Sequence, residues 1–375
     1  PGSDAMGSVD ALQRVTTTSQ MDMEMGVETE DGLTRMDGTL VVAGNANIGG
    51  IFELGALGMA QIAGDSMFTL APIDGILTVE GDLTAETLII NGFAQFDTGV
   101  VGALTIGNGA MLLASDIQST GDFVNLGTFQ LGRPGNGAGE FRAGGTFRQS
   151  GIFSGIGTIN GDFIQEAFAG GPSAEDIIFN PGFSPGIVNI TGDAMFLDGA
   201  IFMEIGGLTP GLEHDQINIG GSLVLGSNAT VIVDLLELGD GSGIFLLQTG
   251  DEIILFTAQS ISPDDGEPIH FVVQDELPLG FTVVPDIMQN ADGEIFRVLR
   301  GFNGSELTTL GGLDPAQLAV AGAIDFLSTA ESGVPSPELF QLAIDLQFSE
   351  DLSAQLANLT ALGGTSLSAL QSSAF

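Results

Sequence analysis

Three arginines lie close together in the most basic stretch of the sequence: Arg133, Arg142 and Arg148. Phe141 and Phe147 are sequence neighbours of the last two. A guanidinium next to an aromatic ring is suited to binding an anion or a sugar, because it combines a fixed charge, several donors and a stacking surface. These arginines are therefore the candidate anion or sugar contacts. The competing interpretation, which we favour, is that they only balance neighbouring carboxylates.

Asp264, Asp265 and Glu267 form an oxygen-rich turn that is the best candidate for holding a metal ion. Carboxylate oxygens are the ligands that Ca²⁺ prefers. The turn matches neither an EF-hand loop nor the Gly-Gly-x-Gly-x-Asp nonapeptide. The simpler interpretation of this stretch is a solvated acidic turn that holds no metal ion. Ca²⁺ is the one cofactor that we consider, and the sequence predicts no other cofactor.

Histidine is the residue type to examine for catalysis, and the chain has two. His214 precedes Asp215, and His270 lies in a predicted strand. A Ser-His-Asp site would need both a serine and the correct geometry, and the Gly-x-Ser-x-Gly elbow does not occur. The stretch 213–216 is typical of a turn before a strand. We therefore predict no catalytic residue and no enzyme.

Composition excludes several partners. Seven Lys and Arg, all of them Arg, against 48 Asp and Glu give a net charge of −41. Such a surface repels nucleic acid, because phosphate binding needs a basic face. Hydrophobic residues make up 43% of the chain and mean hydropathy is +0.36, so a core can form. Without Cys there is no disulfide and no thiolate zinc site. No apolar run is long enough for a transmembrane helix.

A short pattern of alternating apolar residues followed by a glycine turn recurs along the chain. Clear examples are Leu77–Ala85, Val188–Phe196 and Ile217–Leu225, the first two containing Gly-Asp turns. Alternation with period two indicates strands with one buried face. Repetition at about 18–30 residues favours a solenoid, and the lack of helices in this part favours a parallel β-helix. An antiparallel sandwich or barrel is the alternative.

The pattern of apolar residues and turns changes along the chain, and these changes divide the chain into five predicted segments. Pro1–Ser8 look like a scar of tag cleavage and cloning, and 9–38 form an irregular N-terminal edge. The β-helix extends over 39–267, and longer strands over 268–302 form a β cap. Residues 303–375 are predicted to be a short α-helical segment, because Asp314 and Pro315 are typical of a helix N-terminus and leucines follow at helical spacing.

Two stretches carry a family resemblance. The first is Asn180-Pro-Gly-Phe-Ser-Pro-Gly-Ile-Val-Asn-Ile-Thr-Gly-Asp193 with the strands that follow, and the second is Leu313–Leu327 with the later helices. In this order they resemble the passenger and pre-barrel segment of bacterial type V autotransporters. The resemblance implies a right-handed β-helix that is exported across the outer membrane of a Gram-negative bacterium. It also implies a translocator barrel as a partner, which we expect to have been removed after Phe375.

These observations together predict a secreted or surface-exposed, autotransporter-like passenger with a structural, adhesive or self-associating role. Its expected partner is a cell-surface or matrix ligand, or another copy of itself. Two alternatives stay open. One is a carbohydrate-active β-helix enzyme, a lyase or hydrolase, since with 48 acids the sequence cannot single out a catalytic carboxylate pair. The other is an acidic matrix protein organised by Ca²⁺.

Overall fold

The computed structural model describes residues 8–9, 15–17, 21–23, 26–36, 39–42, 45–133, 137–237, 243–248, 251–264, 269–274, 277 and 281–302. The prediction of a mostly β chain is confirmed for these residues, which form strands β1 to β29. Their one other regular element is a single 3₁₀ turn, η1 (Ala174–Asp176). The predicted helical segment, 303–375, lies outside the described residues.

The strands pair in three parallel ladders. The first ladder joins β1 (Ser8–Val9), β4 (Gly26–Met36), β6 (Asn45–Leu54), β8 (Ser66–Ile73), β10 (Asp82–Ile90), β11 (Phe93–Ile106), β12 (Met111–Ser119), β15 (Gly139–Ala143), β18 (Gly157–Asn160), β21 (Ile187–Ile190), β23 (Gln216–Ile219) and β25 (Glu252–Ala258).

The second ladder uses β2 (Val15–Thr17), the later parts of β4, β6, β8, β10 and β11, then β13 (Phe123–Asn125), β16 (Phe147–Gln149), β19 (Phe163–Gln165), the beginnings of β22 (Ala194–Ile205) and β24 (Ser222–Leu235), and β26 (Ser260–Pro263).

The third ladder joins β3 (Met21–Met23), β5 (Thr39–Val42), β7 (Met59–Ile62), β9 (Ile76–Val79), the beginnings of β11 and β12, β14 (Thr128–Leu131), β17 (Ile152–Gly155), β20 (Ile178–Pro181), the ends of β22 and β24, and β27 (His270–Val273). β28 (Phe281–Asn290) and β29 (Gly293–Phe302) follow.

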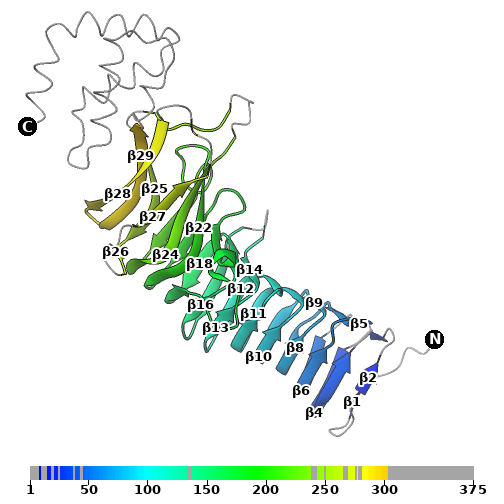
Figure 1. Cartoon of the computed structure of the whole chain (residues 1–375). Coiled ribbons are helices and arrows are strands. Elements are labelled where there is room, and N and C mark those ends of the chain that lie inside the picture. The colour runs from blue at the N-terminus through cyan, green and yellow to red at the C-terminus, as the bar shows by residue number, and fades with distance from the viewer. Residues whose placement is uncertain are drawn as a thin grey trace, which may run out of the picture. The chain divides into compact units, whose positions relative to one another are not determined.

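From β5 to β27 the chain visits the three ladders in a repeating order: third, first, second. Each circuit adds one strand segment to every ladder, and Figure 1 shows β4, β6, β8, β10 and β11 side by side in this order. Because these pairs are parallel, the antiparallel alternative is wrong for this part. The circuits differ in length: equivalent turn residues are 17 apart at Asp74 and Asn91, but 31 apart at Asp162 and Asp193.

The space between the ladders is filled by Leu, Ile, Val, Ala and Phe side chains, of which Phe is the bulkiest. Thirteen Phe side chains among the described residues are at most 1% exposed: Phe52, Phe68, Phe96, Phe123, Phe129, Phe141, Phe147, Phe153, Phe163, Phe179, Phe196, Phe256 and Phe296. The rings of Phe123 and Phe147 have centroids 4.5 Å apart, and those of Phe147 and Phe163 are 5.1 Å apart. Each buried Phe stabilises the fold by about 1.5–3 kcal/mol, so this column is a main source of stability.

Three amide side chains form a buried polar row within the core, Asn125, Gln149 and Gln165, each 0% exposed and in register on β13, β16 and β19. Asn125 Nδ2 donates to Gln149 Oε1 at 2.6 Å, and Gln149 Nε2 donates to the Gly151 carbonyl at 2.6 Å. Gln165 Nε2 donates to the Asp198 carbonyl at 2.8 Å. We call these three residues the amide row. Its hydrogen bonds offset the cost of burying polar groups.

The recurring Gly-Asp turns have a specific physical cause. At the turn before the second ladder, Asp162 Oδ1 accepts the Asp193 N–H at 3.0 Å, and Asp193 Oδ1 accepts the Ser222 N–H at 2.8 Å. A Cβ on Gly192 would lie 2.2 Å from Asp162 Oδ1. The glycine therefore leaves room for the carboxylate of the preceding circuit, which satisfies a backbone donor at the turn.

The chain divides into two compact units. The larger comprises 1–245, 254–274 and 287–297, and the smaller comprises 246–253, 275–286 and 298–375. Every site discussed below lies in the larger unit. Within the described part of the chain, no helix has the length and apolar character needed to cross a membrane.

Candidate functional site

The three candidate arginines each meet a carboxylate of their own. Arg133 lies 2.9 Å from Asp97, and Arg148 lies 2.5 Å from Glu166. Arg142 pairs with Glu140 on the same strand. β15 and β16 belong to different ladders, and because neighbouring strand residues point to opposite faces, Phe141 and Phe147 are buried in the core beneath the arginines. This arrangement supports charge balance rather than an aromatic-flanked anion site.

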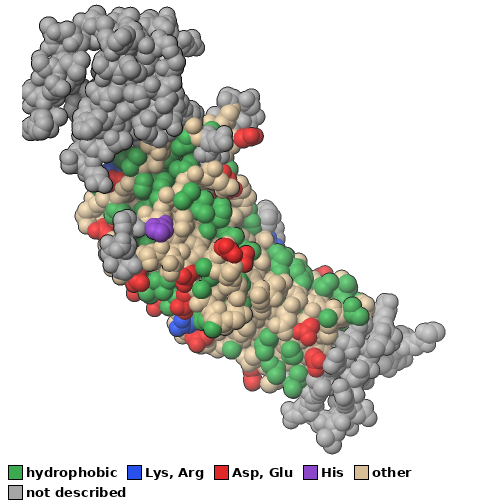
Figure 2. All heavy atoms as spheres, in the orientation of Figure 1, with side chains coloured by type: hydrophobic (Ala, Val, Ile, Leu, Met, Phe, Trp, Pro, Cys, Tyr) green, Lys and Arg blue, Asp and Glu red, His purple; other side chains and the backbone are tan. Residues whose placement is uncertain are grey.

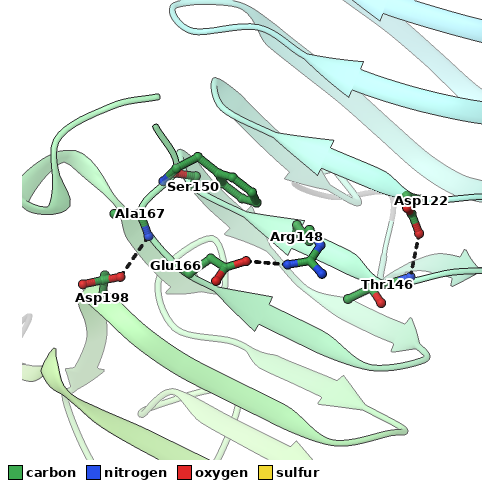
Figure 3. A network of polar contacts seen from close by, with 8 residues as sticks. Asp122, Thr146, Arg148, Ser150, Glu166, Ala167 and Asp198 are labelled. Carbon is green, nitrogen blue, oxygen red and sulfur yellow. Dashed lines mark hydrogen bonds and ion pairs between the residues drawn. The ribbon is translucent and has the colours of Figure 1, made fainter. Parts of the chain in front are cut away.

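Arg148 takes part in a polar network around the loop that follows β19 (Figure 3). The Ala167 N–H donates to Asp198 Oδ2 at 2.9 Å, and the Phe168 N–H donates to Ser150 Oγ at 3.2 Å. These contacts fix the start of the longer connection between the second and third ladders. The network thus explains Arg148 as a support for a loop.

The metal candidates are only partly described. Asp264 is exposed at the end of β26, and its N–H donates to the Leu225 carbonyl at 3.0 Å. Asp265 and Glu267 lie outside the described residues. Among the residues that are described, no three His, Cys, Asp or Glu side chains are grouped so that they could share a metal ion.

The two histidines occupy different environments. His270 is exposed on β27. His214 is 2% exposed, and its Nδ1 donates to the Gly207 carbonyl at 3.1 Å in the tautomer that carries a proton there. Burial lowers the pKa of His214, against the opposing effects of the Gly207 hydrogen bond and of Glu213. His214 thus acts as a packing residue that closes the 206–214 loop.

Asp215, next to it, joins three separate segments of the chain. Its Oδ1 accepts the Gly186 N–H at 2.6 Å, and its Oδ2 accepts the Glu204 N–H at 2.8 Å. Its own N–H donates to the Glu204 carbonyl at 2.9 Å. We call Asp215, Gly186 and Glu204 the Asp215 junction. It connects the Pro181–Gly186 turn to the end of β22 and the start of β23.

The junction also constrains the chemistry of this carboxyl. Asp215 is 0% exposed. Burial raises the pKa of Asp215 to about 8, although the two backbone donors act in the opposite direction. Gly186 cannot carry a side chain here, because a Cβ would lie 2.3 Å from Ile156 Cγ2. The geometry is that of a structural clamp, with each carboxylate oxygen already bound.

The outward side of the third ladder is an uncharged surface. Eight successive segments, Thr-Leu-Val-Val, Met-Ala-Gln-Ile, Ile-Leu-Thr-Val, Phe-Ala-Gln-Phe, Met-Leu-Leu-Ala, Thr-Phe-Gln-Leu, Ile-Phe-Ser-Gly and Ile-Phe-Asn-Pro, contain no Asp, Glu, Lys or Arg. We call their outward side, from β5 to β20, the uncharged face. In contrast, Glu140 and Arg142 project from the first ladder and Arg148 from the second.

Two columns of side chains run along the uncharged face. The apolar column is Met59, Ile76, Phe93, Met111, Thr128, Ile152 and Ile178, in continuous register. The glutamine column beside it is Val41, Gln61, Thr78, Gln95, Leu113, Gln130, Ser154 and Asn180. Ile76 is 42% exposed and Ile152 is 36% exposed. On the side of the molecule drawn in Figure 2, carboxylates lie in small separate groups among hydrophobic and uncharged side chains.

Sequence reasoning missed three of these features: the Asp215 junction, the amide row and the uncharged face. The amide row had a readable signal, because Phe-Val-Asn, Phe-Arg-Gln and Phe-Ile-Gln repeat the same inward, outward, inward pattern. The uncharged face could have been found by comparing the charges of successive strands. No protein-family model and no curated protein matches the chain.

Proposed function

We propose that this protein is a right-handed parallel β-helix that is secreted or exposed on the surface of a Gram-negative bacterium, as an autotransporter-like passenger. Its role is structural, adhesive or self-associating, and it works by contact rather than by catalysis. The three parallel ladders, visited in a repeating order, support the β-helix. The resemblance of the 180–193 stretch supports the handedness and the export route.

The uncharged face is the observation that carries the contact role. A chain with a net charge of −41 would be expected to scatter carboxylates over every outward strand. Instead, eight successive strand segments have none, and their outward side chains are partly or fully exposed. Exposed apolar side chains arranged in a continuous patch are typical of interaction surfaces.

Bead adhesion tests this proposal with the full chain. Beads coated with folded protein should clump or be retained on bacterial cells or matrix-coated surfaces. Beads coated with heat-unfolded protein carry the same charge and should not. Folded beads that neither clump nor adhere would contradict the contact role, and release of reducing sugar from polysaccharides would favour an enzyme instead.

A further inference from the structure

The dipeptide Asn-Gly is chemically labile, and it occurs five times in this chain. The glycine nitrogen can attack the side-chain carbonyl carbon of the preceding asparagine, because glycine has no side chain to block the approach. The structure describes three of these asparagines: Asn91, Asn108 and Asn160. They differ in whether the two reacting groups are already held by hydrogen bonds, so the fold decides which of them can react.

Asn108 lies at the tip of the turn that joins β11 to β12. The Ala110 N–H donates to the Gly107 carbonyl at 3.0 Å, and Gly109 has a φ of +78°, which matches a type II turn. Asn108 and Gly109 are both exposed, and a Cβ on Gly109 would meet no atom within 4 Å. Within the part of the chain that the structure describes, neither the Asn108 carboxamide nor the Gly109 N–H has a hydrogen-bond partner. Both reacting groups are therefore open to water.

Asn91, in contrast, is held at both reacting groups. Its Nδ2 donates to Asp74 Oδ1 at 2.7 Å, and the Gly92 N–H donates to the Ile73 carbonyl at 2.9 Å. A Cβ on Gly107 would lie 2.7 Å from Asn91 Oδ1, so the next circuit also covers this amide. Attack on the Asn91 side chain therefore requires hydrogen bonds of the turn to break first.

Asn160 is held in the same way, but by side chains alone. Its Nδ2 donates to Glu140 Oε1 at 2.8 Å, and the Gly161 N–H donates to Thr191 Oγ1 at 3.0 Å. Both partners lie on other circuits of the chain. The two hydrogen bonds at Asn160 can therefore be removed by substitution without changing the Asn-Gly pair itself.

We propose that Asn108 is a site of spontaneous covalent modification, where the folded protein converts asparagine to aspartate and isoaspartate while Asn91 and Asn160 stay intact. The Gly109 nitrogen loses its proton to a base in solution and attacks Asn108 Cγ. A new C–N bond closes a five-membered imide, the bond from Cγ to Nδ2 breaks, and ammonia leaves. Water then opens the imide at either carbonyl. No oxidant, reductant or enzyme is needed, and this inference does not depend on the proposed contact role.

The modification changes the turn in two ways. A neutral amide becomes a carboxylate, and isoaspartate carries the main chain through its side-chain carbon, which lengthens the backbone. Both ends of the turn are fixed, since the Met111 N–H donates to the Gly92 carbonyl at 2.9 Å and the Ala110 carbonyl accepts the Thr128 N–H at 2.8 Å. The exposed tip absorbs the added backbone atom, so the modified protein stays folded and carries a new charge beside the uncharged face.

Peptide mapping by mass spectrometry gives the first test, on the unmodified full-length protein. One sample is kept folded and one is unfolded in guanidinium chloride, both at the same mildly alkaline pH and temperature. Dividing the unfolded rate by the folded rate at each asparagine cancels the influence of the neighbouring residues. Asn108 should show little protection. Asn91 and Asn160 should be protected at least about fivefold, because two hydrogen bonds, each worth a factor of roughly 2–12, must break first.

The double variant Glu140→Ala, Thr191→Ala gives the second test, because it removes both hydrogen bonds at Asn160. Circular dichroism and thermal unfolding first show that the variant is folded. The rate at Asn160 in the folded variant should then rise at least about fivefold, while the rate at Asn108 stays the same. Equal protection of all three asparagines in the natural protein, or an unchanged rate at Asn160 in the variant, would overturn the proposal. Aspartate without isoaspartate at position 108 would indicate direct hydrolysis and would overturn it as well.

Discussion

The carboxylate of Asp215 accepts the backbone N–H of Gly186 at 2.6 Å, across 29 residues of sequence. The turn that contains Gly186 begins at Pro181, the last residue of β20. A recognisable turn motif and a buried acid in the following circuit therefore form one structural unit. Their pairing holds a tight turn in place next to strands of the first and third ladders.

Asp215→Asn should destabilise the protein, because the new amide N–H₂ would face one of the two backbone donors. A buried donor left without an acceptor costs about 1–3 kcal/mol. Since burial raises the pKa of Asp215 to about 8 from an ordinary value of 3.8, its contribution is fully present below pH 3.8 and is lost as pH rises through 8. Urea unfolding at pH 5, 7 and 9 measures both effects.

The expected pattern is that the stability difference between the natural protein and the Asn variant shrinks as pH rises. A difference that grows with pH would mean that the two backbone donors outweigh burial and that the carboxyl is ionised throughout. Asp198→Asn serves as the control, because its carboxylate also accepts a backbone N–H at 2.9 Å but in an exposed setting.

Gly145→Ala should destabilise the fold by about 1–3 kcal/mol, as overpacking substitutions do. A Cβ there would lie 2.3 Å from Asp122 Oδ1, while the next nearest atoms are 3.2 Å away. Removing the carboxylate in Asp122→Ala should therefore relieve most of the clash. A double-mutant cycle measured by chemical denaturation should show the double variant losing less than the sum of the two single changes.

Gly151→Ala provides the comparison for this cycle. Its Cβ would lie 2.1 Å from the Gly127 carbonyl oxygen, a backbone atom that cannot be removed. Adding Asp122→Ala to the Gly151→Ala variant should therefore not reduce the loss of stability that Gly151→Ala causes. Additive effects at Gly145 would show that the carboxylate moves away at little cost and that the glycine is needed for another reason.

Gln149→Leu should cost more stability than Gln165→Leu, although both replace a buried amide of the amide row. Gln149 lies in the middle, where it accepts from Asn125 and donates to the Gly151 carbonyl. Gln165 is at the end, and its Oε1 is buried without a hydrogen-bond partner. Because an unsatisfied buried acceptor is itself destabilising, its removal offsets part of the loss at Gln165. Thermal and urea unfolding of the two variants would test the order.

Calcium should stabilise the folded chain no more than magnesium does. The Asp162 and Asp193 carboxylates already accept backbone donors, and screening of a −41 charge is not specific for one divalent ion. Melting temperatures would be compared at about 5 mM of each ion, above the dissociation constants of about 10⁻⁴–10⁻³ M of extracellular calcium modules. A clearly larger rise with calcium would support the calcium-organised matrix protein.

Much of the secondary structure could be predicted from the local alternation of apolar and polar residues. Strands such as Val188–Ile190 and Ile217–Ile219 alternate apolar and polar residues, and Gly-Asp turns separate strands, so a mostly β chain with short strands could be predicted residue by residue. The inward phenylalanines follow from the same alternation. A strand's local sequence determines its period, because successive side chains must point to opposite faces.

Contacts between residues that are far apart in the sequence could not be predicted from this local alternation. The circuits differ in length, so the sequence cannot show that Gly186 meets Asp215, or that Gln61, Gln95 and Gln130 align in one column. Register depends on how each circuit stacks on the one before it, and the longer connections shift that register without leaving a local signal. Stacking therefore decided which turn each carboxylate holds and which side chains share the uncharged face.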